Sequence, residues 1–505
     1  MQQVMQQLDE YFGITEKGSS VRTEVMAGFT TFLTMAYILI VNPSMLALAG
    51  LPFDDVLFAT AMAAFVGCVV MGLWANLPFA LAPGMGLNAY FTFAVVGAMG
   101  IAWQVALAAV LVEGVIFLII SLPQVGLRTQ MINSIPKDLK IATGAGIGMF
   151  LALIGFREMG WVVNHPVTLV GLADMGALSY DSGALLGMIA VLAISVMMVK
   201  RIPGAIIIGI LGISIIGWAV GADDPYNAYG SADHWDVNAD DPYTPGCTDN
   251  CTQTQMTAGW GSDVAEWPTS IFGFVGMPEK SLGAAVNALG DIGGKDVSVS
   301  SFLLVMIAFL FVDIFDTAGT LYSVGRQAGY VDENDELMNS DEAFMSDASA
   351  TIVGALAGTS TTTTYIESAA GVEEGGKTGL TAVVVGILML SGLFLSGLFA
   401  AIPTFAAACA LVVIGAMMMR QAADINWGDY EIAIPAFITM VLMPFTYSIA
   451  QGIAWGVITY VVIKVGTGKH EQLNPVMWTL GFILAMFYIG PGDGNTFEWL
   501  LGLIF

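Results

Sequence analysis

Two aspartates, Asp313 and Asp316, lie three positions apart in a stretch that is otherwise largely apolar, FLFVDIFDTAGTLYSVG. In a helix this spacing puts both carboxyl groups on one side, and Thr320, four residues after Asp316, joins them there. Two carboxyl groups so close do not readily ionise together, so one of them holds a proton more easily. The pair could therefore carry a proton near neutral pH or accept hydrogen bonds from a polar substrate. A narrower interpretation, in which Asp313 only bonds neighbouring backbone or hydroxyl groups, stays open.

Two further carboxylates, Glu113 and Glu367, interrupt apolar segments, and no Lys or Arg is expected at their depth. An ionisable residue within a membrane span is a functional candidate by default, because burying it without a partner is costly. Glu113 precedes Gly114 in VLVEGVIFLIISL, a pattern that favours a structural hydrogen bond at a helix contact. Glu367 follows a run of threonines, GTSTTTTYIESAAG, and there a binding role is favoured.

The composition explains why such residues must lie in a membrane. Of 505 residues, 56% are hydrophobic and only 11% are charged. Soluble proteins are about 25% charged, and disordered chains are poor in hydrophobic residues. We therefore predict an all-α polytopic protein of the cell membrane whose surroundings are the lipid bilayer.

The charge balance is strongly acidic, with 41 Asp and Glu against 15 Lys and Arg and a net charge of −26. This excess excludes nucleic acid as a partner. Many acids gather in the loops 222–268 and 327–347, where we expect a solvated surface. Because concentrated salt screens the repulsion between such charges, the pattern suggests a halophilic, archaeal source.

Apolar stretches near the length that crosses a bilayer predict fourteen spans in two sets of seven. They are 23–43, 56–76, 83–98, 101–122, 139–156, 182–199 and 203–221, then 299–325, 345–358, 360–372, 378–400, 402–419, 431–449 and 451–466. A further segment, 474–489, is interpreted as a peripheral helix, and no cleavable signal peptide is visible in the polar N-terminal segment. Twelve of the 15 basic residues fall on one side, which predicts a cytoplasmic N-terminus and an extracellular loop 222–298.

Spans 3 and 10 occupy matching places in the two sets, and both are broken. LPFALAPGMGLNAYF contains Pro83 and Gly84 before a half-helix, and the threonine run before Glu367 favours extended backbone. Paired broken spans are the best sequence indication of a transporter's binding site. Asn88 and Glu367 are then expected at the starts of half-helices near the midplane. Asn88 offers both a donor and an acceptor, although it could also be a helix cap.

The sequence resembles the nucleobase/ascorbate transporter superfamily, the nucleobase–cation symporters of the second type. Within it, the chain is most similar to the AzgA-like adenine/guanine/hypoxanthine permeases. The resemblance covers most of the chain, and loop 222–268 looks like an insertion. It rests on VRTEVMAGFTTFLTMAYILIVNP, NLPFALAPGMGLNAYF, IPKDLKIATGAGIGMFLALIG, FVDIFDTAGTL, SDASATIVGALAGTSTTTTYIESAAGV and MPFTYSIAQGIAWG.

The resemblance implies a core domain and a gate domain, built from a 7+7 inverted repeat. The expected segments are a cytoplasmic N-terminus (1–22), spans 1–4 of the core (23–122), spans 5–7 of the gate (139–221), an acidic extracellular loop (222–298), spans 8–11 of the core (299–400), spans 12–14 of the gate (402–466) and a C-terminal segment (467–505). Short antiparallel strands in spans 3 and 10 would hold a purine base. A homodimer through the gate domain is also implied.

The family's acidic residues map onto Asp316 and Glu367, and the important Asn of the AzgA-like branch maps onto Asn88. Uracil and xanthine relatives carry a Glu on span 8 and a His four residues later. This chain has Asp316 and Thr320 there, which points to the purine branch. Glu367 would accept from ring N–H groups. Asp316 would bind the far edge of the base or the coupling proton, and Asp313 is a further candidate for the proton.

Four other residues complete the expected site. Backbone N–H groups near Gly86 and Thr363 could bind the base, and the ring of Tyr90 or Phe315 could stack on it. No cofactor and no bound metal ion are expected.

The function expected is uptake of purine bases by symport with a proton, with sodium as the rival cation. One alternative is an anion carrier of the sulfate type with the same architecture, although the acidic site argues against it. Another is a membrane-embedded enzyme that uses Asp313 and Asp316, although no nucleophile or metal set accompanies them.

Four cysteines are present. Cys68 and Cys409 lie in spans and are expected to be small apolar packing residues. Cys247 and Cys251, in CTDNC of the outer loop, could form a disulfide, and Asn250 matches a glycosylation acceptor.

Overall fold

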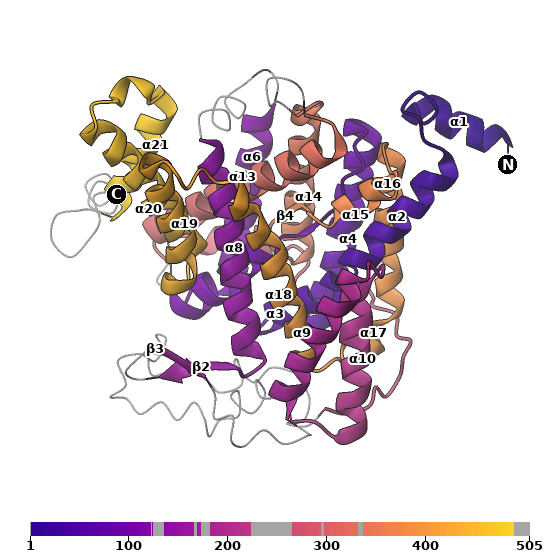
Figure 1. Ribbon diagram of the computed structural model, residues 1–505. Coiled ribbons are helices and arrows are strands. Elements are labelled where there is room, and N and C mark those ends of the chain that lie inside the picture. Colours follow the sequence, from indigo (N-terminus) through magenta and orange to yellow (C-terminus); the bar gives the residue numbers. More distant parts are fainter. Residues whose placement is uncertain are drawn as a thin grey trace.

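The computed structural model describes residues 2–122, 124, 136–165, 169–172, 182–223, 265–293, 297–331 and 337–488. Within them the chain is mostly helical, and long helices run side by side (Figure 1). The predicted disulfide between Cys247 and Cys251 and the acceptor Asn250 lie outside the described residues.

The first part of the chain runs to the outer loop. Its elements are α1 (Gln2–Phe12), α2 (Val21–Met35), α3 (Ile38–Ala47), α4 (Phe53–Val70), η1 (Met71–Ala75), β1 (Leu81–Pro83), α5 (Met85–Ala89), η2 (Tyr90–Ala98), α6 (Trp103–Ser121), α8 (Lys137–Glu158), β2 (Val162–His165), β3 (Leu169–Leu172), α9 (Gly183–Val199) and α10 (Ala205–Val220).

The second part follows that loop. Its elements are α12 (Ala284–Ala288), η5 (Leu289–Asp291), α13 (Val299–Ala328), α14 (Ser340–Ala357), β4 (Thr362–Thr364), α15 (Ser368–Glu373), α16 (Gly379–Met389), η6 (Leu390–Phe394), α17 (Ser396–Phe399), α18 (Thr404–Met419), η7 (Arg420–Asp424), α19 (Tyr430–Thr446), α20 (Ile449–Gly466), η8 (His470–Gln472) and α21 (Pro475–Tyr488).

Among the described residues, seven helical segments are long and apolar enough to cross a membrane, and six shorter apolar helices accompany them. The long segments are Val21–Ala47, Phe53–Ala75, Trp103–Ser121, Lys137–Glu158, Ser301–Arg326, Thr404–Asp424 and Ile449–Gly466. The predicted all-α polytopic fold is thereby confirmed, while the count of fourteen spans stays a prediction. A helix, α21, forms where segment 474–489 was predicted, and its position relative to the membrane stays a prediction.

The two broken spans meet as a pair of short strands. β1 and β4 pair antiparallel, although they are far apart in sequence, and all six residues are buried. The predicted strands in spans 3 and 10 are therefore confirmed. The register pairs Leu81 with Thr364, Ala82 with Thr363 and Pro83 with Thr362.

Local sequence explains why these segments are extended and close together. The β-branched threonines favour strand geometry. After β1 a glycine is required, because a Cβ at Gly84 would lie 2.9 Å from Oγ1 of Thr363. Cys68 of α4 is buried and free, as is Cys409, and its Sγ accepts a hydrogen bond of 3.1 Å from the backbone N–H of Leu81. Cys68 therefore anchors β1 as well as packing in the core.

Helix packing follows two groups. α2, α4 and α6 pack against α13, α14 and α16, whereas α8 packs against α18, α19 and α20. The approach of α8 to α18 depends on two glycines, because a Cβ at Gly415 would lie 2.4 Å from the carbonyl oxygen of Gly148. Small residues of this kind let helix backbones approach closely in membranes. The division into core and gate domains stays a prediction.

Buried acids also tie span ends to neighbouring turns. Glu24 of α2 is fully buried and accepts hydrogen bonds from the backbone N–H groups of Lys377 (3.0 Å) and Thr378 (3.1 Å), just before α16. Asp55 of α4 accepts one of 2.9 Å from the backbone N–H of Ser281, just before α12. These two carboxylates satisfy N–H groups that would otherwise be buried without acceptors.

Candidate functional site at the two short strands

Glu367 lies directly before α15, close after β4, and is 4% exposed. Its Oε1 accepts a hydrogen bond of 2.7 Å from the hydroxyl group of Tyr37. Tyr37 lies in the break between α2 and α3 and is 1% exposed, so the bond is shielded from solvent. A hydrogen bond to an ionised acceptor is among the stronger kinds. Tyr37 therefore fixes one edge of the Glu367 carboxyl group, and the sequence analysis missed it.

Asp316 lies on α13, which packs against β4. It is 8% exposed and lies within hydrogen-bonding reach of the Thr363 side chain on β4. Thr320, one turn later, donates its hydroxyl hydrogen to the backbone oxygen of Asp316 at 2.9 Å. The structure therefore brings Asp316 and Thr363 close together, while the hydroxyl of Thr320 is engaged with its own helix. A role for either residue in binding stays a prediction.

Asp347 corrects the prediction that acids of segment 327–347 lie on a solvated surface. It is fully buried on α14, and its Oδ1 accepts a hydrogen bond of 3.0 Å from the hydroxyl of Thr364. Thr351, one turn further on, exchanges hydrogen bonds with the backbone of Thr362 at 3.0 and 3.1 Å. The i, i+4 spacing of these two polar residues was the available signal, and the acidic and serine-rich first half of the same helix concealed it.

Asn88 is fully buried in α5, and both ends of its carboxamide have protein partners. Its Nδ2 donates to Oδ1 of Asn42 at 2.6 Å, and its Oδ1 accepts from the hydroxyl of Ser360. Asn42 in turn donates to Oγ1 of Thr60 (2.7 Å) and of Thr359 (2.9 Å). The helix-cap alternative is wrong, because α5 begins three residues before Asn88. This network connects α3, α4 and α5 to the segment that enters β4.

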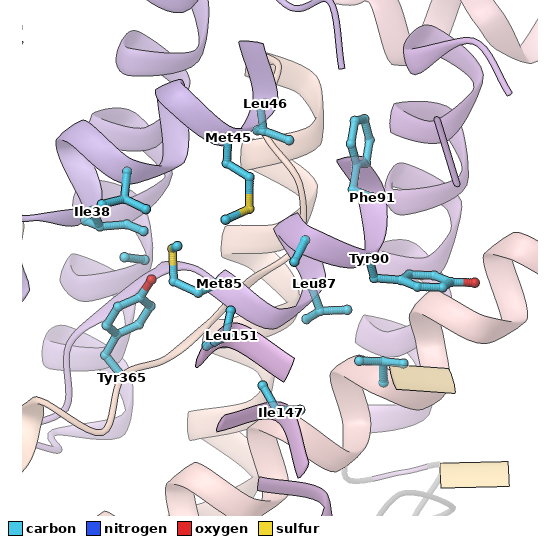
Figure 2. Packing of buried hydrophobic residues seen from close by; sticks show 14 of the residues in the cluster. Ile38, Met45, Leu46, Met85, Leu87, Tyr90, Phe91, Ile147, Leu151 and Tyr365 are labelled. Atoms are coloured by element: carbon cyan, nitrogen blue, oxygen red, sulfur yellow. The ribbon is translucent and has the colours of Figure 1, made fainter. Parts of the chain in front are cut away.

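Apolar side chains surround the half-helix α5. Figure 2 shows Met85 beside Tyr365 of the post-strand turn, with Leu87 further along the half-helix and Ile147 of α8 below it. α5 lies so close to α8 that a Cβ at Gly86 would be 2.7 Å from Cγ2 of Ile147. The first N–H groups of a helix have no partner within the helix, and Gly86 lies in that first turn.

The two aromatic candidates are both buried. The ring of Tyr90 lies edge-on against Phe309 of α13, with centroids 5.2 Å apart, and Figure 2 shows it directed away from Met85 and Tyr365. Phe315 is 2% exposed. An aromatic ring already held in an edge contact must give up that geometry to stack on a ligand.

Glu113 lies on α6, and Asp313 lies on α13 one turn before Asp316. Both are fully buried, and their carboxyl groups are within hydrogen-bonding reach of each other across the contact between α6 and α13. Oδ1 of Asp313 also accepts from the hydroxyl of Thr317 at 3.3 Å. The sequence predicted that Glu113 lies at a contact between helices and forms a structural hydrogen bond there. It does lie at such a contact, between α6 and α13, and its neighbour across the contact is a second acid, Asp313.

The chemistry of the site is that of hydrogen-bond acceptors in an apolar enclosure. Among the described residues, no basic residue pairs with Asp313, Asp316, Asp347 or Glu367, in contrast to Glu431, which binds two lysines. Within the same residues, no group of three His, Cys, Asp or Glu is placed to hold a metal ion. Buried carboxyl groups without a cation can accept hydrogen bonds from a neutral polar ligand or hold protons.

Comparison with known proteins agrees with this architecture. Residues 22–455 match the model of a family described as the permease family. The chain is 39% identical to the guanine/hypoxanthine permease PbuG of Bacillus subtilis over 95% of this chain and 99% of the relative. It is 38% identical to the adenine permease AdeP of Escherichia coli over 95% of this chain and 96% of the relative.

Solved structures show the same fold at low sequence identity. The transmembrane domain of the cyanobacterial bicarbonate transporter BicA has a TM-score of 0.55 at 12% identity, with 86% of this chain and 97% of that chain covered. The murine anion transporter Slc26a9, in its inward-facing state, has a TM-score of 0.53 at 11% identity, with 88% and 68% covered. At such identity these two likenesses show the fold alone.

Proposed function

The chain belongs to the permease family and is a multi-pass membrane transporter rather than an enzyme, and from this premise we propose that it transports purine nucleobases. The observation that carries the proposal is the meeting of β1 and β4 beside Asp316 and Glu367, two buried carboxyl groups without basic partners. It is supported by relatives named for guanine, hypoxanthine and adenine.

The chemistry of a purine suits this site. A purine ring is planar and largely apolar on its faces, and its edge carries N–H donors and ring-nitrogen acceptors. Glu367 accepts from the N–H groups of the base, and Asp316 faces its far edge or holds the coupling proton. Backbone N–H groups near Gly86 and Thr363 complete the hydrogen bonds of the base, those on either side of Thr363 by exchanging their present partners on Thr351 and Asp347.

The remaining residues have supporting roles in this proposal. Asn88 fixes the two broken spans relative to each other. Its amide can bind the base only after it gives up its hydrogen bond with Asn42 or Ser360. Tyr90 or Phe315 stacks on the ring after a change of rotamer.

Transport by alternating access requires one group of helices to move against the other. In the proposal α2–α6 and α13–α17 form the core domain, and α8–α10 with α18–α20 form the gate domain. The N-terminus is cytoplasmic, loop 222–298 is extracellular, and a homodimer forms through the gate domain.

The coupling cation is a proton, with sodium as the rival. Binding a proton together with the neutral base removes a negative charge from the site before it crosses the membrane, which lowers the electrostatic cost of the movement. Uptake of labelled hypoxanthine into vesicles separates the two cations: a proton ionophore should abolish uptake, and collapse of the sodium gradient should leave it intact.

The central test is uptake of radiolabelled hypoxanthine by cells that lack their own purine permeases. Glu367→Gln and Asp316→Ala should each abolish uptake, while Glu374→Gln, at an exposed position just beyond α15, should leave it unchanged. Normal uptake by either site variant would overturn the site assignment. Competition by adenine, guanine, xanthine and uracil then identifies the preferred base.

The alternatives are less favoured. An anion carrier needs positive charge or free helix N-termini at its site, and here the described site is acidic. A membrane enzyme would need a nucleophile or metal beside Asp313 and Asp316. Sulfate uptake and hypoxanthine breakdown, measured beside hypoxanthine uptake, distinguish these functions.

A further inference from the structure

Two fully buried carboxyl groups face each other outside the strand pair. Glu113 of α6 and Asp313 of α13 are both 0% exposed. Three of their four carboxyl oxygens have no hydrogen-bond partner within the described residues. They are both oxygens of Glu113 and Oδ2 of Asp313. The two groups are nevertheless within reach of each other. Apart from the hydroxyl of Thr317, which donates to Oδ1 of Asp313, the only donor that these oxygens can have within the described residues is a proton of their own.

The elements packed against α6 supply no positive charge to this pair. These elements are α12, α13, α14, η2 and η5. α13 contributes Asp313 itself, with Asp316 one turn later. α14 contributes Asp347, whose carboxyl group is close enough to repel an ionised Asp313. η2 contributes Tyr90, whose ring packs on Phe309, whereas α12 has no ionisable residue and Asp291 of η5 is exposed.

The basic residues on α13 and on the helices packed against it lie elsewhere. Lys137 and Lys140 of α8 lie near Tyr322 and Gly319, six to nine residues beyond Asp313, and Arg326 follows Asp313 by more than three turns. Arg157 lies over the rings of Phe93 and Tyr447, and Lys464 of α20 is bound to Glu431.

Electrostatic repulsion and the cost of burial decide how many protons such a pair of carboxyl groups holds. Two ionised carboxylates in contact, without a donor or a cation, would repel each other where the dielectric constant is low. Burial of even one unpaired carboxylate costs far more than a hydrogen bond supplies. A proton on one carboxyl group removes one charge and makes that group a donor to the other.

We propose that Glu113 and Asp313 form a proton-binding site that holds one proton between their carboxyl oxygens, separate from the carboxyl groups of Asp316 and Glu367. The site takes up a hydrogen ion, with formation of one O–H bond on either acid, and its charge changes from −2 to −1. In this assignment Glu113 is a functional group rather than a helix-packing residue.

A line of hydroxyl and carboxyl groups connects this site with β4. Thr317 donates to Oδ1 of Asp313 at 3.3 Å and lies within hydrogen-bonding reach of Asp347. Asp347 accepts from the hydroxyl of Thr364 at 3.0 Å. In the present arrangement the Thr317 hydrogen points to Asp313, so the hydroxyl must first rotate to direct it at Asp347. Asp313 can then give its proton to the Thr317 oxygen while Thr317 releases its own hydrogen to Asp347, and one proton moves toward the strand.

This connection makes the pair the store of the coupling proton, a role that rests on the proposed transport function. The presence of the shared proton does not rest on that function, so the two parts are tested separately.

Infrared spectroscopy tests the shared proton in the purified full-length protein without substrate. A protonated carboxyl group has a carbonyl stretching band that is distinct from the bands of a carboxylate and shifts in heavy water. The difference spectrum between the unmodified protein and Glu113→Gln at neutral pH should show loss of one such band, and Asp313→Asn should give the same loss. Both substitutions keep the side-chain shape and place an N–H donor against the remaining carboxylate, which can then ionise.

The control is Glu374→Gln, in which an exposed carboxyl group is changed in the same way and the band should remain. Melting temperatures confirm that each variant is folded. An unchanged carbonyl region in folded Glu113→Gln would overturn the proposal.

Proton movement tests the coupling role in proteoliposomes. Addition of hypoxanthine outside should acidify the interior with the unmodified protein, and the number of protons moved per hypoxanthine should fall to zero with Glu113→Gln. An unchanged ratio would overturn the coupling role. If the unmodified protein moves no hypoxanthine, the proposed function fails, and the infrared result still decides whether the pair holds a proton.

Discussion

The hydroxyl of Tyr37 donates a hydrogen bond of 2.7 Å to Oε1 of Glu367, across 330 residues of sequence. Both residues lie where a span is interrupted: Tyr37 between α2 and α3, and Glu367 between β4 and α15. The breaks in two spans therefore converge, and the tyrosine holds the carboxyl group that the proposal assigns to the base.

Removal of this hydroxyl by Tyr37→Phe should weaken hypoxanthine binding. A hydrogen bond to a charged group contributes about 1.5–3 kcal/mol, and a loss at the lower end of that range corresponds to about tenfold in affinity. Equilibrium binding to purified protein measures the effect. Tyr430→Phe, at a position that is 77% exposed, is the matched control and should bind normally. Equal affinity of Tyr37→Phe and the unmodified protein would exclude a positioning role for Tyr37.

The pair Asn42 and Asn88 predicts a loss of stability rather than a loss of affinity alone. Asn42→Ala leaves Nδ2 of Asn88 buried without its 2.6 Å acceptor, and an unsatisfied buried group costs about 1–3 kcal/mol. Both Asn42→Ala and Asn88→Ala should therefore lower the melting temperature. If Asn88→Ala instead kept the melting temperature and lost only hypoxanthine binding, Asn88 would be a ligand without a structural role.

Thr351 should hold β4 in place through its hydroxyl group. Thr351→Val keeps the shape of the side chain but removes the partner of the backbone N–H and C=O of Thr362. The melting temperature should fall, and amide hydrogen exchange should become faster at Thr362–Thr364, because local opening of the strand becomes easier. Thr34→Val, whose hydroxyl bonds only the carbonyl groups of its own helix, is the control. Unchanged exchange at β4 would contradict the anchoring role.

Arg157 links the two helix groups at one end of α8. Its guanidinium lies over the rings of Phe93 (5.8 Å) and Tyr447 (5.6 Å) and donates to the Tyr447 hydroxyl at 3.1 Å. Cation–π contacts contribute about 0.5–2 kcal/mol. Arg157→Gln should therefore speed amide exchange over Tyr90–Ala98, the element that carries Phe93, and Arg157→Lys should do so less. Equal protection in the unmodified protein and Arg157→Gln would show that this contact does not hold the element.

Local sequence was sufficient for the parts of the site that depend on local chemistry. Pro83 and Gly84 stop a helix, and the threonine run favours a strand, so both broken spans were predictable. Asp316 and Glu367 stood out because each interrupts an apolar segment.

The partners of these residues were not predictable in the same way. Nothing near Tyr37 indicates that its hydroxyl meets Glu367, because that contact depends on how distant spans pack. The role of Asn42 was not predictable for the same reason, because its partners Thr60, Asn88 and Thr359 lie on other segments. Asp347 was missed because an acid-rich loop runs into its helix without a change in composition, and only burial separates Asp347 from Asp341.

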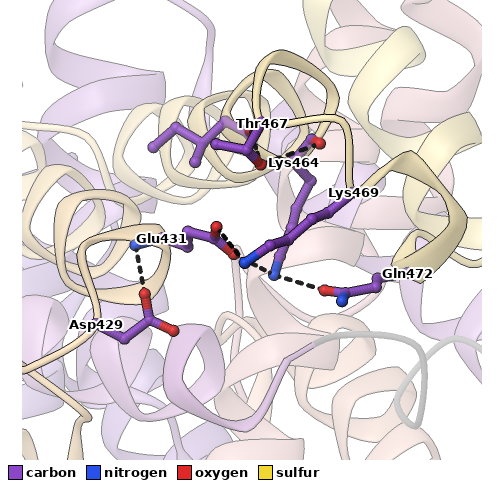
Figure 3. Close-up of polar contacts among 7 residues, drawn as sticks. Asp429, Glu431, Lys464, Thr467, Lys469 and Gln472 are labelled. Carbon is purple, nitrogen blue, oxygen red and sulfur yellow. Dashed lines mark hydrogen bonds and ion pairs between the residues drawn. The ribbon is translucent and has the colours of Figure 1, made fainter.

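Glu431 joins the start of α19 to the end of α20. It forms salt bridges of 2.7 Å with both Lys464 and Lys469, and Lys464 also donates to Oε1 of Gln472 at 2.9 Å (Figure 3). The bond with Glu431 raises the pKa of Lys469, which lies in the loop after α20. A lysine whose pKa is raised on folding stabilises the protein below its unfolded pKa, and this contribution is lost as the pH rises through the folded value.

Glu431→Gln should therefore lower the melting temperature at neutral pH, and the difference from the unmodified protein should disappear at strongly alkaline pH. Added sodium chloride should also reduce the difference, because Lys469 is 48% exposed and its pair is screened, although the part due to the buried Lys464 should persist. Glu471→Gln, in η8 close to Lys469, is the control for the change in net charge. A difference that did not respond to either pH or salt would show that packing of the Glu431 side chain, and not its charge, holds the two helices together.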